Sequence, residues 1–142
     1  RSVATFTCAV VTPSQSVLDE EVTQVEFPQW DGQRGILAGA APFVAKLGAG
    51  RLRIESSQGE NRHFMLAGGF AEMHENALVL VADEVVPIEE LELEKAEADL
   101  AEAIAAVTEP GHTNLMDRDR LEMARNRASV EVALAKGQSG KG

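Results

Sequence analysis

Tyrosine is absent from the sequence, and aromatic residues make up only 4% of its 142 residues. Any hydrophobic core must therefore be mainly aliphatic, and a hydrophobic fraction of 44% is enough to build one. Cys8 is the only cysteine, which excludes an intrachain disulfide and a clustered thiolate site. We expect Cys8 to be a small buried residue on a strand.

Long hydrophobic runs and surplus positive charge are also missing. The uncharged stretch Gly35–Ala45 is too short and too interrupted by Gly and Pro to span a bilayer. The N-terminus lacks the basic-then-apolar pattern of a signal peptide. A net charge of −10 disfavours nucleic acid and direct docking on anionic lipid. We therefore expect a soluble, intracellular chain without direct membrane insertion, which reaches any membrane through a protein partner.

Several motifs of catalysis and metal binding are absent as well. The sequence has no phosphate loop of the G-x-x-x-x-G-K-[ST] kind and no serine in a G-x-S-x-G frame. His63, His74 and His112 lie far apart and lack a metal-ligand spacing. We expect no catalytic residue, no metal site and no cofactor in this chain.

The character of the sequence changes at Pro87. Eight of the twelve glycines precede it, and the apolar residues there form short strand-like runs. The first of these runs places Phe6, Cys8 and Val10 on one face, and Glu75-Asn76 is typical of a two-residue hairpin turn. Strands are predicted at Val3–Thr12, Val22–Phe27, Arg51–Glu55, Arg62–Ala67, Phe70–Met73 and Ala77–Ala82, with Gly68-Gly69 as a break. So many short strands predict a β-sandwich, or flattened barrel, over residues 1–86.

Beyond Pro87 the periodicity becomes helical. The pattern predicts one helix over Ile88–Val107, a stop at Thr108–Thr113, and a second helix from Thr113 or Asn114 to about Lys136. The apolar stripes are Leu93, Ala96, Leu100, Ala103, Ile104 and Val107, and then Leu121, Ala124, Ala128, Val132 and Ala135. We expect an antiparallel helical hairpin over residues 87–136, followed by a disordered tail over 137–142.

Four sequence blocks stand in an order and at a spacing that resemble those of a known family. They are Val10–Pro13 with Val17–Val22, Gly32–Pro42, Gly50–Ile54, and Ala67–Met73 with Val79–Asp83. Together they resemble the epsilon subunits of bacterial-type F-type ATP synthases, which are equivalent to the mitochondrial delta subunit. The family's signature loop has the form G-x-x-G-I-x-P-G-H-A-P. Here its proline and histidine are Ala38 and Ala40, so contacts of that histidine do not carry over, whereas Gly35, Ile36, Gly39 and Pro42 match.

The resemblance implies a rotor part of the central stalk with no reaction of its own. In this family the β domain grips the gamma subunit and rests on the ring of c subunits, which couples proton-driven rotation to the catalytic alpha and beta subunits. The implied location is peripheral, on the cytoplasmic face of the bacterial inner membrane. The ring-facing loop would comprise Trp30, Asp31, Gly32, Gln33 and Arg34. Trp30 is either an exposed interface residue or folded back over the edge of the sandwich.

The family's hairpin is a regulatory inhibitor of ATP hydrolysis, which docks on the β domain or extends into the catalytic subunits. By resemblance, a basic face of Arg118, Arg120, Arg125 and Arg127 would meet acidic loops there; the alternative is an intrahelical ion-pair face with Asp117, Asp119 and Glu122. Some members bind ATP through an [IL]-D-x-x-R-A motif. Glu92 and Lys95 replace its Asp and Arg, and because lysine lacks arginine's fork of donors, we do not expect ATP binding.

Two other readings stay open. One is a small ligand-binding β module, which would need convergent polar groups on inward strand positions. The other is a helical-hairpin adaptor on a β scaffold, unrelated to the synthase. Recovery of the gamma and catalytic subunits in a pull-down would separate the rotor reading from both.

Overall fold

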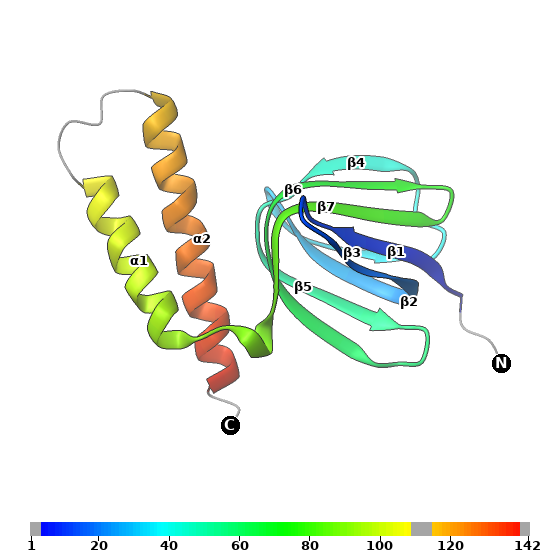
Figure 1. Ribbon diagram of the computed structural model, residues 1–142. Coiled ribbons are helices and arrows are strands. Elements are labelled where there is room, and N and C mark those ends of the chain that lie inside the picture. The colour runs from blue at the N-terminus through cyan, green and yellow to red at the C-terminus, as the bar shows by residue number, and fades with distance from the viewer. Residues whose placement is uncertain (1–3, 109–114, 140–142) are drawn as a thin grey trace. The chain divides into compact units, whose positions relative to one another are not determined.

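The computed structural model describes residues 4–108 and 115–139, and the chain divides into two compact units between Pro87 and Ile88 (Figure 1). The described part of the first unit consists of strands, and that of the second is helical. The strands are β1 (Phe6–Val11), β2 (Ser16–Gln29), β3 (Gly32–Leu37), β4 (Phe43–Lys46), β5 (Ala49–Ser56), β6 (Asn61–His74) and β7 (Ala77–Pro87). The second unit has the 3-10 turn η1 (Ile88–Glu90) and the helices α1 (Leu93–Thr108) and α2 (Leu115–Ser139).

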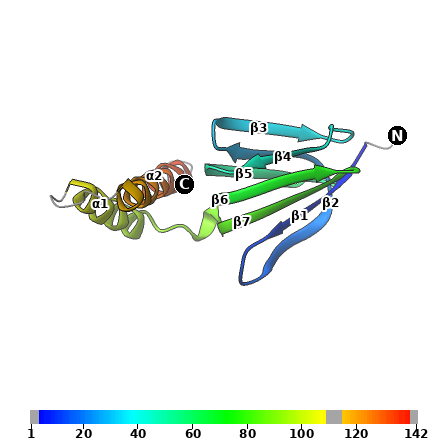
Figure 2. The ribbon, with the colours of Figure 1, turned by 90° about the horizontal axis from the view of Figure 1, so that it is seen from above.

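Five strands of the first unit pair in a closed ring. β1, β7, β6, β5 and β2 are neighbours in that order, and the pairing of β2 with β1 completes the ring. β3 is added outside the ring on β2, and β4 on β6. Figure 2 shows the strands stacked in two layers. The architecture is the predicted flattened β barrel followed by two helices, and the expected fold class is confirmed.

Two long strands change partners halfway along, which flattens the ring into layers. β2 pairs with β1 up to Val22 and with β3 from Gln24, across a register shift between these residues. β6 pairs with β5 up to Ala67 and with β4 from Phe70, and both glycines between have positive φ, 72° and 106°. The predicted break at Gly68-Gly69 is therefore wrong, because the glycines bend β6 without ending its pairing with β7.

The core of this unit lies between the layers and follows the alternation of the strands. Phe6, Cys8 and Val10 are buried on the same face of β1, as predicted. The core is mostly aliphatic, as the scarcity of aromatics requires. Its largest fully buried members include Phe6, Phe27, Leu52, Ile54, Leu66, Met73, Leu78 and Leu80.

The predicted two-residue turn at Glu75-Asn76 is confirmed. Both residues have positive φ, 47° and 62°, and β6 and β7 pair directly beside them, His74 with Ala77. Positive φ at both central positions matches the right-handed twist of the flanking strands, and asparagine tolerates this conformation better than most side chains.

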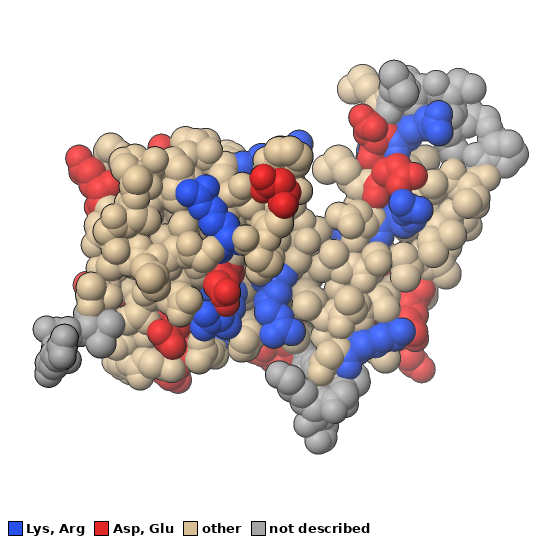
Figure 3. All heavy atoms as spheres, turned by 180° about the vertical axis from the view of Figure 1, so that it is seen from behind, with Lys and Arg blue, Asp and Glu red and all other residues tan. Residues whose placement is uncertain are grey.

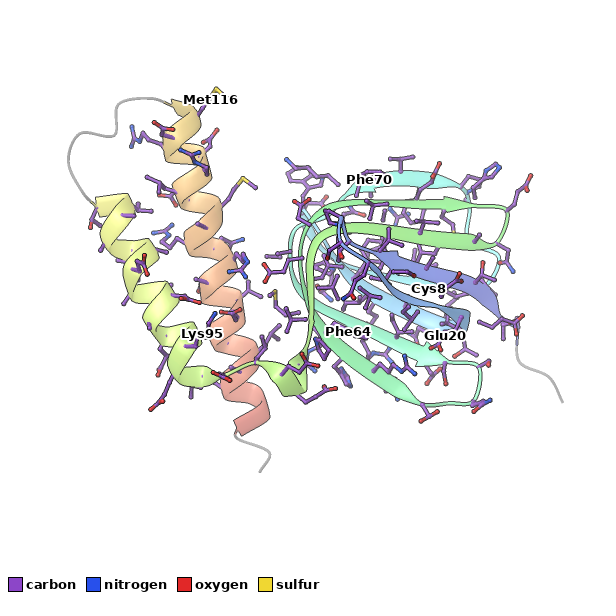
Figure 4. All side chains as sticks on the ribbon, in the orientation of Figure 1. Cys8, Glu20, Phe64, Phe70, Lys95 and Met116 are labelled. Atoms are coloured by element: carbon purple, nitrogen blue, oxygen red, sulfur yellow. The ribbon has the colours of Figure 1, made fainter. Side chains whose placement is uncertain are left out.

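Cys8 is fully buried opposite Glu20 of β2, and its thiol is correspondingly hard to ionise (Figure 4). Burial, with smaller contributions from the Glu20 and Asp19 carboxylates, raises the thiol pKa from 9.0 to about 12. One carboxylate oxygen of Glu20 is itself buried and lacks a hydrogen-bond partner within the described part of the chain. Cys8 therefore packs as an apolar residue and is not set up as a nucleophile.

The raised pKa predicts how alkaline pH affects folding. The unfolded thiol ionises near pH 9, whereas the folded thiol keeps its proton until about pH 12. The thiol's contribution to stability is thus complete below pH 9 and is lost as pH rises toward 12, up to about 4 kcal/mol. We expect urea unfolding at pH 8 to 11 to show this decline, and Cys8→Ala to lack it. An equal decline in the parent chain and in Cys8→Ala would contradict the assignment of this decline to Cys8. Because the chain has no tyrosine, lysines are the main other side chains that titrate at alkaline pH, and both chains contain the same lysines.

The second unit is a helical hairpin in which α1 and α2 pack side by side in opposite directions (Figure 1). The helix predicted from Ile88 is shorter than expected: η1 is a 3-10 turn, and α1 begins only at Leu93. η1 contacts α2 and Ile88 is buried, so local packing overrides the helical periodicity of residues 88–92. α2 continues to Ser139, so the expected disorder of Gly137–Ser139 is also wrong. The predicted caps Thr113 and Asn114 lie outside the described residues, as do 140–142.

The predicted apolar stripes of the hairpin are only partly buried. Ala96 on α1 and Ala128, Val132 and Ala135 on α2 are buried, whereas Ile104 and Ala124 are exposed, contrary to expectation. The buried positions gather where the start of α1 lies beside the end of α2. Because three of these four side chains are alanines, each removes little apolar area from water.

Candidate functional site

The strand β4 and its neighbours present exposed apolar side chains on the outer face of the β unit. Val44 of β4 is 71% exposed and Phe70 of β6 is 47% exposed. Trp30, in the turn between β2 and β3, is 67% exposed. Its backbone N–H donates to the carbonyl oxygen of Lys46 at 2.9 Å. We call these three residues the β4 surface.

The pairing of β4 with β6 explains why Val44 and Phe70 share one face. Val44 pairs with Glu72, and Lys46 pairs with Phe70. The apolar side chains Val44 and Phe70 are therefore diagonal neighbours, and so are the charged side chains Lys46 and Glu72. All four are exposed, whereas the alternate residues Ala71 and Met73 are buried. A surface of exposed apolar side chains interleaved with opposite charges has the composition of a protein-binding surface.

The residues predicted as the ring-facing loop do not all lie in a loop. Trp30 and Asp31 form the turn, while Gly32, Gln33 and Arg34 belong to β3. The exposure of Trp30 confirms that it is not folded back over the sandwich. Asp31 accepts a hydrogen bond from the Gln29 side chain at 2.7 Å, so the tip of the turn is held by its own neighbours.

Arg34 is half-buried and contributes to the packing of the sandwich edge. Its guanidinium lies 3.8 Å from the centre of the Phe43 ring and donates to the Gln29 side-chain oxygen at 3.1 Å. The Phe43 ring in turn stacks on Phe27 at 6.4 Å between centres. These contacts link β3 to β2 and β4, so Arg34 has a structural role.

The signature segment is likewise part strand and part loop. Gly35 and Ile36 lie on β3, with Ile36 buried in the core, whereas Gly39 and Pro42 lie in the connection to β4. The loop turns at Gly39, whose φ of 82° would strain a side chain, whereas Gly35 lies within β3 and makes no turn. The sequence-based expectation of a continuous loop missed β3 and β4, because glycines and alanines there mask a two-residue period.

The arginines of α2 form ion pairs along their own helix. Arg120 contacts Asp117 at 2.9 Å, Arg125 contacts Glu122 at 2.6 Å, and Arg127 lies 3.9 Å from Glu131. Arg118 is exposed. Figure 3 shows acidic and basic side chains interspersed on the hairpin. Three of the four arginines therefore have intrahelical partners, of which Asp117 and Glu122 were predicted and Glu131 was not.

The degenerate nucleotide motif does not form a cluster. Glu92 is exposed just before α1, and its carbonyl oxygen accepts from the Ala96 N–H at 2.9 Å. Lys95 is exposed and lies 3.6 Å from Asp99, one turn along the same helix. The contacts of Glu92 and Lys95 are thus those of ordinary residues in the first turn of a helix.

No group of three or more His, Cys, Asp and Glu side chains within residues 4–108 and 115–139 is arranged to hold a metal ion, and His112 lies outside them. No helix in the same ranges has the length and apolar character needed to cross a membrane.

Comparison with known proteins places the chain in a family. Residues 5–88 match the family model "ATP synthase, Delta/Epsilon chain, beta-sandwich domain". The sodium ion specific ATP synthase epsilon chain of Propionigenium modestum is 39% identical over 100 residues, 69% of this chain and 72% of that one. The ATP synthase epsilon chain of Nostoc punctiforme is 30% identical over 134 residues, 94% of this chain and 98% of that one.

Solved structures show the same fold. A chain of the Euglena gracilis mitochondrial ATP synthase, in a structure of its OSCP/F1/c-ring, superposes with a TM-score of 0.80 at 26% identity, covering 94% of this chain and 82% of that one. A chain of the Tetrahymena thermophila mitochondrial ATP synthase central stalk/c-ring has a TM-score of 0.69 at 12% identity, covering 95% and 99%, and supports the fold alone. The chain belongs to the family of F-type ATP synthase epsilon subunits.

Proposed function

We propose that this subunit is a non-catalytic rotor part of a proton-translocating ATP synthase, which links the gamma subunit to the c-subunit ring. The observation that carries the proposal is the β4 surface on the unit that matches the family model. The solved structures that share the fold come from assemblies described as F1/c-ring and central stalk/c-ring. Peripheral attachment through the complex, on the cytoplasmic face of the bacterial inner membrane, is part of the same proposal.

We assign the gamma subunit to Val44 and Phe70 of the β4 surface, and the c-ring to the β2–β3 turn, which contains Trp30. Exposed Phe and Trp side chains are the typical anchors of protein interfaces, and Val44 and Phe70 lie on paired strands that hold them rigidly. Asp31 and Gly32, at the exposed tip, are small, and the Asp31 carboxylate suits contact with the polar loops of a ring. Gln33 is exposed at the beginning of β3 and belongs to the same contact.

The decisive experiment is co-purification of the full chain with its own organism's gamma subunit and c-ring. We expect a stable complex with gamma alone, and recovery of the ring only when gamma is present. Failure to bind gamma, or turnover of a substrate by the isolated chain, would overturn the proposal. An adaptor or ligand-binding module outside the synthase would fail to bind gamma.

We propose further that the hairpin is a regulatory inhibitor of hydrolysis, moving between a docked and an extended state. The alanine-rich contact between α1 and α2 supports weak, reversible packing. Ile104, Met116 and Met123 are exposed apolar residues of the hairpin, which the catalytic alpha and beta subunits would cover in the extended state. A few kcal/mol between the two states is enough for such a switch.

Removal of the hairpin is expected to raise ATP hydrolysis without loss of assembly. The truncation should follow Pro87, because β7 pairs with β6 up to that residue. If the inhibitory state holds half of the population, deletion raises the hydrolysis rate by about twofold, and by more if it holds a larger share. The measurement is ATPase activity of the purified complex with full-length or truncated chain. Loss of gamma binding on truncation would show that the two units do not divide the roles in this way.

A further inference from the structure

Asn76 ties together three segments of the β unit that are distant in sequence. Its side-chain Oδ1 accepts a hydrogen bond from the Gly39 N–H at 2.9 Å, and its Nδ2 donates to the Thr5 carbonyl oxygen at 2.9 Å. Its own carbonyl oxygen accepts from the Thr7 N–H at 3.2 Å. One residue of the β6–β7 turn thus holds both the β3–β4 connection and the beginning of β1.

This position requires the chemistry of asparagine. The backbone φ of 62° is tolerated by Gly, Asn and Asp and strained for most other residues. The side chain must accept from one segment and donate to another, which an amide does and a carboxylate does not. Glycine fits the backbone but makes neither bond. Asn76 therefore combines two requirements that its closest substitutes satisfy only in part.

The segment held by Asn76 leads directly to the β4 surface. Residues 38–42 connect β3 to β4, with a backbone hydrogen bond from the Ala40 N–H to the Leu37 carbonyl oxygen at 3.3 Å. Val44 follows Pro42 by two residues and is the most exposed member of that surface. A shift of the connection would therefore move the beginning of β4 and, with it, Val44.

We propose that Asn76 is a positioning residue for partner binding: its bond to Gly39 fixes the β3–β4 connection and presents the β4 surface to gamma. Both side-chain bonds lie at the exposed surface, where water competes with them, so they add little to global stability. Their effect is local order in a segment that binds. The inference rests on the proposed function for the identity of the partner.

The test uses the full chain with Asn76→Gly and Asn76→Asp. Both variants suit the backbone of the turn, but only the aspartate can still accept from the Gly39 N–H. Amide hydrogen exchange at Gly39, followed by NMR, should accelerate about five- to tenfold in Asn76→Gly and change little in Asn76→Asp. Affinity for purified gamma should fall by a similar factor in Asn76→Gly alone, while the thermal midpoints of the two variants stay close.

Unchanged exchange at Gly39 in Asn76→Gly would overturn the inference, and so would equal gamma affinity of both variants and the parent. Equal losses of affinity in the two variants would also contradict it, because the aspartate keeps the bond at issue. A parent chain that does not bind gamma overturns the proposed function and, with it, the partner named here. The exchange measurement, which needs no partner, still decides whether the bond orders the connection.

Discussion

Replacement of Gly69 by alanine is expected to unfold the β unit or to lower its free energy of unfolding by at least about 3 kcal/mol. Gly69 has φ 106° at the bend of β6, and a Cβ there would overlap the carbonyl oxygen of Val81. The next nearest atoms, Val81 C and Ala82 Cα, lie at 2.9 Å and also belong to the backbone of β7. No rotamer change can relieve the overlap, so β6 and β7 would have to separate.

Gly59→Ala is the matched control for this prediction. Gly59 has a similar φ of 88°, but a Cβ there would meet nothing within 4 Å. Its cost is the backbone strain alone, about 1 to 2 kcal/mol. Urea unfolding of both variants, followed by circular dichroism, measures the difference between them. Equal losses would mean that the close approach of β7 contributes nothing and that φ alone decides.

Placing a charge on the β4 surface is expected to abolish most of the affinity for gamma. Phe70→Asp removes a half-exposed aromatic ring and puts a carboxylate two residues from Glu72 on the same face. Loss of an anchor of this kind costs about 2 kcal/mol or more, which is a loss of at least about 30-fold in affinity. Calorimetric titration of gamma with the full-length variant measures the effect, and the thermal midpoint reports whether the fold is kept.

Leu37→Asp provides the comparison for Phe70→Asp. Leu37 is also a large exposed apolar residue, at 61%, but it lies on β3 and pairs with Gln24 of β2. The substitution Leu37→Asp should weaken gamma binding much less than Phe70→Asp does. Equal effects of the two variants, or none from Phe70→Asp, would mean that gamma does not bind on the β4 surface.

The parts of this fold that the sequence predicted are those with a local signal. Alternation placed Phe6, Cys8 and Val10 on a buried face, and Glu75-Asn76 carried the mark of a two-residue turn. β6 was divided in two because paired glycines in a strand are ambiguous: they end a strand or bend it. Only the partner strand β7, which continues past the bend, decides between these outcomes.

The β4 surface could not be found by the same reasoning. Phe43, Val44 and Ala45 are all apolar, so alternation within β4 does not reveal which side faces water. That depends on the pairing of β4 with β6, which joins residues from Lys46 and Phe70, 24 positions apart, to Phe43 and Met73, 30 positions apart. The signal for this surface in the sequence is the uncharged segment Gly35–Ala45, which closely follows the single tryptophan, Trp30.

The ion pairs of α2 determine what an approaching molecule would meet. Leu115–Ser139 contains five basic and four acidic residues, a net charge of +1, and three of the arginines already lie beside a carboxylate of their own helix. Each of these pairs lies within one helix, and at a distance the opposite charges of a pair largely cancel. At long range, an acidic target would therefore attract this helix about as strongly as it attracts a single positive charge. Binding of the helix would depend first on close apolar contact. Single arginines could then exchange their carboxylate partners at little cost in free energy.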